Sequence, residues 1–116
     1  MRAVTAALAL ALVAVAAPVP AHHGWSSYDE SKPITLTGPL RSISWSNPHG
    51  TAEMTWQGKT WDVVLAPVRR MEARGLAAED INRGQRVTIT GYARRDGAAE
   101  MRIERISAGD KTVELR

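Results

Sequence analysis

The 116-residue sequence predicts an all-β fold, a small barrel of five strands with one short helix, and three observations favour it. After residue 33, apolar and polar residues alternate in several short runs, which is the pattern of half-buried strands. Turn-forming pairs such as Gln57-Gly58 and Asp96-Gly97 separate these runs. The segment 67–74 instead repeats its apolar residues at helical spacing, so it predicts the one helix.

The first predicted strand, 34–45, changes its inward-facing parity along its length. Its early apolar residues and its late ones fall on opposite faces, namely Ile34, Leu36 and Leu40 against Ile43 and Trp45. Such a change requires a bulge or a bend, which we place at Gly38-Pro39. Asn47-Pro48 then starts a turn that Gly50 closes.

The second and third strands, 51–56 and 60–66, alternate cleanly around the Gln57-Gly58 turn. The helix follows, with Pro67 suited to its first turn and Gly75 to the position after its end. Residues 76–81 can add a further turn of helix. The fourth strand, 85–95, and the fifth, 100–107, complete the set, and Ile106 has the opposite parity to Met101 and Ile103. A turn at 109–111 leads into a short last run.

This order, with the helix between strands 3 and 4 and a kinked first strand, matches an OB-like β-barrel over residues 34–116. Five short amphipathic strands in so small a chain would leave two exposed edges unless the sheet closes on itself. A flat sheet with the helix on one face is the alternative.

The first 21 residues differ from the rest, because they carry one charge, Arg2, and an apolar run of Ala, Leu and Val. They predict a signal peptide, 1–21, cleaved after Ala21, and therefore an exported protein that we place in the periplasm. The run is shorter than a membrane span and ends in prolines, so we expect no stable membrane span after cleavage. Residues 22–33 predict an irregular N-terminal arm. The chain has no cysteine, so no disulfide staples the fold.

The histidines are the residues most suggestive of chemistry. Cleavage after Ala21 makes His22 the first residue, so its α-amino group and imidazole both become nitrogen donors near neutral pH. His23 adds a second imidazole, and His49 can supply a third if the arm folds back over the turn at 47–50. Such a nitrogen-rich set suits copper(II), with nickel or zinc also tolerated. The plainer interpretation is a polar start to the chain and a histidine that only bonds its local backbone.

Four tryptophans and no phenylalanine stand in the sequence. Trp45, Trp56 and Trp61 have inward parity, which predicts packing against the core. Trp25 lies in the arm beside the histidines, where it either pins the arm to the barrel or lines a pocket. We name Trp25, Trp45 and Asn47 as candidate binding or arm-contact residues.

The net charge is +3, and acidic residues are interleaved with the arginines, so we expect no nucleic-acid binding. The sequence holds no phosphate-binding loop, nucleophile elbow or zinc-protease motif, and we predict no catalytic residue. The leading hypothesis is therefore a non-enzymatic periplasmic barrel that binds copper. A metal-free module that binds a periplasmic protein or small ligand is the alternative, and redox catalysis at an N-terminal copper site is a third.

Several motifs also resemble one known family. They are A-H-H-G at the cleavage site, K-P-I-T-L-T-G, W-S-N-P-H, and the run G-Q-R-V-T-I-T-G-Y-A-R-R-D-G. Together they are similar to a bacterial family of small exported proteins, known only as domain of unknown function six-one-five-two. The resemblance covers residues 21–115 and implies a periplasmic β-rich domain without a known activity. The positions it marks are His22, His23, Trp45, Asn47, Pro48, His49, Trp61 and Gly91.

Overall fold

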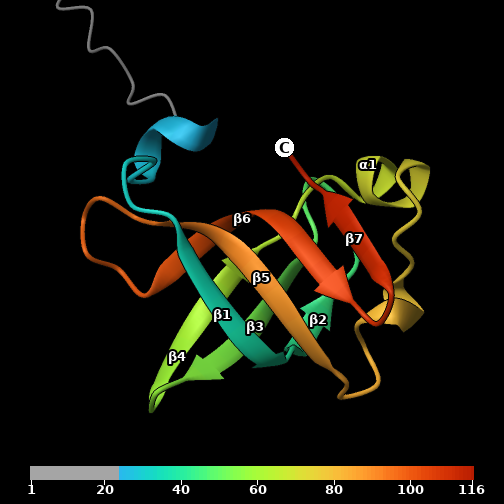
Figure 1. Ribbon diagram of the computed structural model, residues 1–116. Helices are drawn as coiled ribbons and strands as arrows, with labels where there is room; N and C mark the ends of the chain where they lie inside the picture. Colours follow the sequence, from blue (N-terminus) through green and yellow to red (C-terminus); the bar gives the residue numbers. More distant parts are fainter. Residues whose placement is uncertain (1–23) are drawn as a thin grey trace, which may run out of the picture.

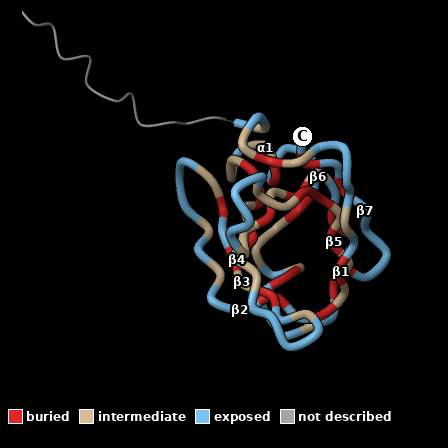
Figure 2. Tube along the Cα trace, turned by 90° about the vertical axis from the view of Figure 1, so that its left-hand side faces the viewer, coloured by how far each residue is buried: buried red, intermediate tan, exposed pale blue. Residues whose placement is uncertain are grey.

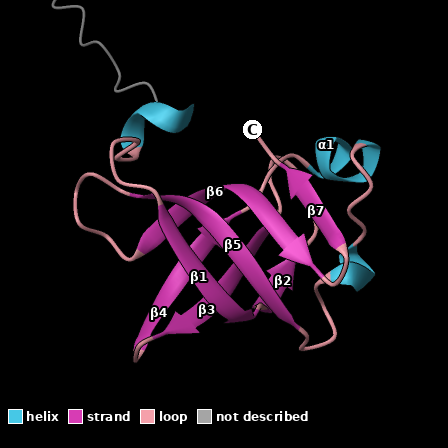
Figure 3. Cartoon of the chain, viewed as in Figure 1, coloured by secondary structure: helices cyan, strands magenta, loops and turns pink. Residues whose placement is uncertain are grey.

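The computed structural model describes residues 24–116, and these residues are mostly β-structure with one short α-helix (Figure 3). The predicted signal peptide, 1–21, lies outside the described residues, as do His22 and His23. The predicted β-rich class and the position of the helix are confirmed. Among the described residues no helix is long and apolar enough to cross a membrane.

Seven strands and three helical segments follow one another along the described chain. The strands are β1 (Ile34–Pro39), β2 (Arg41–Ser44), β3 (Thr51–Trp56), β4 (Lys59–Val64), β5 (Arg86–Ala93), β6 (Glu100–Ala108) and β7 (Lys111–Glu114). The α-helix α1 (Val68–Ala73) lies between β4 and β5, and the 3-10 helices are η1 (Gly24–Ser27) and η2 (Ala78–Asp80).

All seven strands belong to one curled sheet in the order β1-β5-β6-β4-β3-β2, with β7 added alongside β6 (Figure 1). Every pairing is antiparallel except that of β4 with β6, which is parallel. The strands at the two ends of this order, β1 and β2, are consecutive in the chain. The sheet must therefore curve until its first and last strands lie close to each other.

The predicted count of five strands was wrong, because the long first strand is divided and a seventh strand pairs at the end. β1 pairs with β5 through Pro39, whereas β2 pairs with β3 from Arg41, so the chain changes partners at Leu40. The break therefore falls one residue after the predicted Gly38-Pro39. Ser42, with φ +50°, lies inside a further register irregularity of β2. The short last run is β7, which pairs with β6.

A second irregularity lies in the pairing of β5 with β6. Thr90 pairs with Arg105 but the next residue, Gly91, pairs with Ile103, so Glu104 is passed over. This bulge is why Ile103 and Ile106, which have opposite parity, are both fully buried. Tyr92 is also buried, but it lies outside the core cluster and contacts Trp25 of the arm.

The core fills the inside of the curled sheet with aliphatic and methionine side chains, and buried residues concentrate in the strands (Figure 2). Met54, Ile89 and Met101 are all fully buried there. The predicted helix is confirmed: Pro67 precedes α1, Met71 is buried beneath it, and Gly75 follows with φ +90°. Three of the tryptophans, Trp45, Trp56 and Trp61, are only partly buried and pack against the edge of the core.

Candidate functional site

The arm begins with an aromatic contact on the outside of the sheet. Trp25, in η1, meets Tyr92 of β5 edge-to-face, with ring centroids 6.1 Å apart. Arg102 of β6 and Arg116 each place a guanidinium carbon near the same Trp25 ring, at 4.4 and 4.5 Å from its centroid. These contacts bury aromatic surface and attract two cations, and both effects hold the arm against the sheet.

Backbone hydrogen bonds then extend the arm along the end of β5. The Asp29 amide donates to the Ala93 carbonyl at 2.8 Å, and the Arg95 amide donates to the Ser27 carbonyl at 3.0 Å. Tyr28 and Arg94 form an isolated antiparallel bridge between these bonds. The segment from 24 to 29 is therefore attached to the β5–β6 hairpin by its own backbone.

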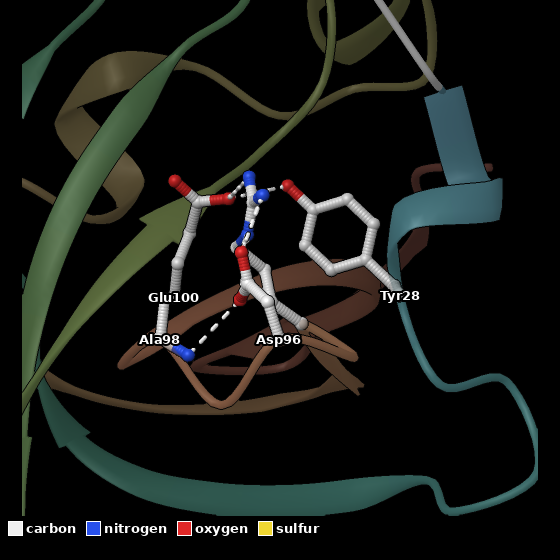
Figure 4. Close-up of polar contacts among 5 residues, drawn as sticks. Tyr28, Asp96, Ala98 and Glu100 are labelled. Carbon is white, nitrogen blue, oxygen red and sulfur yellow. Dashed lines mark hydrogen bonds and ion pairs between the residues drawn. The ribbon is translucent and has the colours of Figure 1, made fainter. Parts of the chain in front are cut away.

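A polar network completes this attachment (Figure 4). The Tyr28 hydroxyl donates to the Glu100 carboxylate at 2.7 Å, and Arg94 bonds both Asp96 and Glu100. Burial and this bond to Glu100 raise the pKa of Tyr28 to about 12, because both disfavour the phenolate. The Arg94 guanidinium holds the pKa of Asp96 below its usual range, and the Ala98 amide, which donates to Asp96, adds to this effect.

The loop that carries His49 is attached differently, through the core. Gly50 is buried, and its amide donates to the Ala66 carbonyl while its own carbonyl accepts from Leu65, both at 2.9 Å. A Cβ at Gly50 would lie 2.7 Å from the Met71 methyl group, which shows how closely the loop packs on α1. His49 itself is half-buried.

Trp45 and Asn47, the other two candidate residues near this loop, lie at the surface. The Trp45 indole donates to Glu72 of α1 at 3.3 Å, so Trp45 joins the loop to the helix. Asn47 is exposed and precedes a cis peptide bond to Pro48.

The arm and the His49 loop are connected through the C-terminal segment and α1. Figure 1 shows η1 above the left part of the sheet and α1 above the right part, with the C-terminus between them. The contacts agree: the Arg116 side chain lies over Trp25, while Arg74 of α1 donates to the Arg116 carbonyl at 2.9 Å. The arm therefore reaches α1 through the C-terminal segment, and α1 packs directly against the His49 loop.

The structure brings Trp45 and the His49 loop against α1 and places Trp25 on the sheet beside the C-terminal segment. It leaves the predicted three-histidine set undecided, because His22 and His23 lie outside the described residues. Within residues 24–116, no group of three or more histidine, cysteine, aspartate or glutamate side chains is placed to hold a metal. Sequence reasoning missed Arg102, Arg116 and Tyr92 as partners of Trp25. Their approach depends on strand pairing and on the path of the C-terminal segment, which local patterns do not encode.

Comparison with known proteins gives a family but no activity. A family model described as a family of unknown function, DUF6152, matches residues 9–102 of the chain. No curated protein matches the sequence.

Proposed function

The chain belongs to DUF6152, a family of unknown function, and from that premise we propose that it is an exported barrel protein that binds a transition metal through His22, His23 and His49. Copper is the metal that such a set of nitrogen donors favours. The observation that carries the proposal is the series of contacts that connects the arm, through Arg116 and α1, to the His49 loop.

Export is supported by the sequence of residues 1–21, with its single charge, apolar run and small residues before the cleavage position. We place the protein in the periplasm, and cleavage after Ala21 would free the amino group of His22. That event supplies a second kind of nitrogen donor, and without it the donors are imidazoles alone.

An OB-like closed barrel is the finer fold that we infer. If β1 and β2 are counted as one bent strand, and β7 as an addition, five strands remain. The bent strand made of β1 and β2 then pairs with both β3 and β5, and β4 pairs in parallel with β6. This pairing supports closure of the sheet into a barrel.

Covalent reach supports the convergence of the histidines. Consecutive Cα atoms are 3.8 Å apart, so His23 cannot lie more than about 7 Å from Trp25, measured between Cα atoms. Trp25 is fixed on the sheet by Tyr92, Arg102 and Arg116.

The proposal is tested by titrating copper(II) into the exported protein, after its intact mass has fixed the first residue. We expect saturable binding of one copper ion, weakened at least tenfold in His22→Ala and in His49→Ala. Thr60→Ala, an exposed change on β4, is the matched control and should bind as the natural protein does.

A variant with one extra residue before His22 separates the amino group from the imidazoles. Unchanged copper affinity in that variant contradicts an N-terminal donor, and unchanged affinity in His49→Ala removes His49 from the site. If the exported protein does not bind copper, the competing function, a metal-free module for a periplasmic protein or small ligand, is favoured instead.

A further inference from the structure

Arg102 is a half-buried cation with an unusual lack of partners. It lies on β6, next to Tyr92 in the β5–β6 pairing, and its guanidinium stacks on Trp25. Its Nε atom is shielded from solvent and has no hydrogen-bond partner. A buried donor left without an acceptor is costly, so such donors in native proteins generally have a partner.

Among residues 24–116, no carboxylate forms an ion pair with Arg102 either. The groups that act on Arg102 are the Tyr28 phenol and two further cations, Arg70 and Arg116, and burial together with these cations lowers the pKa of Arg102. The guanidinium nonetheless stays charged, since arginine does not lose its proton in proteins. Arg94 and Arg105, by contrast, each have an acidic partner on the sheet surface.

The three arginines lie near one another around the arm. Arg102 and Arg116 approach the same Trp25 ring, so their guanidinium carbons are no farther apart than the sum of 4.4 and 4.5 Å. Arg70 donates one N–H to the Leu115 carbonyl, and Arg116 pairs with Glu30. A guanidinium has five N–H donors, so both residues retain donors for another acceptor.

We propose that Arg102, assisted by Arg70 and Arg116, forms a binding site for a small oxyanion, a carboxylate or phosphate group, beside Trp25. The forked donors of a guanidinium match two oxygens of such a group, and a bound anion would compensate the charge of Arg102. Phosphate and carboxylate share this chemistry. The site uses described residues alone and does not depend on copper binding or on processing at Ala21.

The test is a titration of the purified protein with inorganic phosphate, and separately with acetate, against chloride at constant ionic strength. The readouts are the NMR signal of the Arg102 Nε–H group and the melting temperature. We expect a saturable shift of that signal and a saturable rise in melting temperature, because a ligand that binds the folded state stabilises it. A response to phosphate alone or to acetate alone identifies the preferred oxyanion.

Arg102→Gln should weaken anion binding at least tenfold, measured by the rise in melting temperature. Arg69→Gln, an exposed change on α1, is the control and should leave binding unchanged. Arg102→Lys keeps the charge and the stem that packs on Trp25, so it serves if Arg102→Gln loosens the arm, and we expect it to bind several-fold more weakly than the natural protein.

Absence of saturation with both anions would overturn the proposal. So would equal melting-temperature responses in Arg102→Gln and the natural protein, since that result reports a general salt effect. Equal affinity in Arg102→Lys would show that the forked donors are not used.

Discussion

The arm and the His49 loop are connected through the C-terminal segment and α1, yet they are held by opposite kinds of contact. The arm rests on the outside of the sheet through one aromatic contact, a few hydrogen bonds and a polar network around Glu100. The His49 loop is tied to the inside, where Gly50 packs against Met71 and Leu65.

The two regions therefore differ in how much their attachment depends on the core. Contacts on the outer face can be removed one at a time without opening the core, so changes there should affect the arm more than global stability. Contacts of Gly50 and Met71 belong to the core, so changes there should affect both the His49 loop and global stability.

The largest effect is expected at Gly91, which lies where β5 and β6 form the platform under the arm. A Cβ there would lie 2.1 Å from the Arg102 carbonyl oxygen, a backbone atom that cannot turn aside. We expect Gly91→Ala to lower the free energy of unfolding by about 3 kcal/mol or more, measured by urea denaturation. Gly38→Ala is the control, because its Cβ would make ordinary contacts at 3.8 Å or more. Equal stability of the two variants would contradict the close approach of β5 and β6.

A smaller but still large effect is expected under the His49 loop. Met71→Ala removes a fully buried side chain, which should cost about 2–4 kcal/mol of unfolding free energy. The amide of Gly50, which donates to Ala66, should also exchange its hydrogen faster. Arg69→Ala, an exposed neighbour, should change neither quantity. If the Gly50 amide keeps its protection in Met71→Ala, the loop does not depend on the core.

The arm should respond more weakly and more locally. Tyr28→Phe removes the bond to Glu100 and should cost about 1 kcal/mol, or roughly a fivefold faster exchange of the Asp29 amide. Ser31→Ala, a change elsewhere in the arm, is the control. A loss of stability across the whole core would show that the arm and the sheet unfold together, contrary to the comparison above.

The same tyrosine predicts how the arm responds to alkali. Its pKa is raised from 10.0 to about 12, so the folded state holds the phenol proton more tightly than the unfolded state does. The stabilisation is therefore complete below pH 10 and is lost as the pH rises through about 12. Phenolate absorbance, compared between the natural protein and Tyr28→Phe, measures this titration, and an ordinary pKa for Tyr28 would contradict its burial against Glu100.

The smallest effect is expected at Trp45. Its indole bond to Glu72 is exposed and 3.3 Å long, so Trp45→Phe should cost less than about 1 kcal/mol. Urea denaturation measures this change, with Trp61→Phe as a comparison at a tryptophan for which no hydrogen bond to the helix is seen. A cost as large as that of Met71→Ala would mean that Trp45 helps to fix the loop.

The sequence by itself determined the local features of this protein. Alternation of apolar residues predicted β3, β4, β5 and β6, and Pro67 with Gly75 marked the ends of α1. The parity change along residues 34–45 predicted a break in the first strand, because side chains on a strand alternate strictly between its faces.

Only the tertiary structure decided which segments lie together. The first strand divides at Leu40 because the chain before it pairs with β5 and the chain after it pairs with β3. The place of Trp25 between Tyr92, Arg102 and Arg116 also depends on pairings between distant residues. Local periodicity records which face of a strand is apolar. It does not record which strand will be its neighbour, since that choice is made by the closure of the whole sheet.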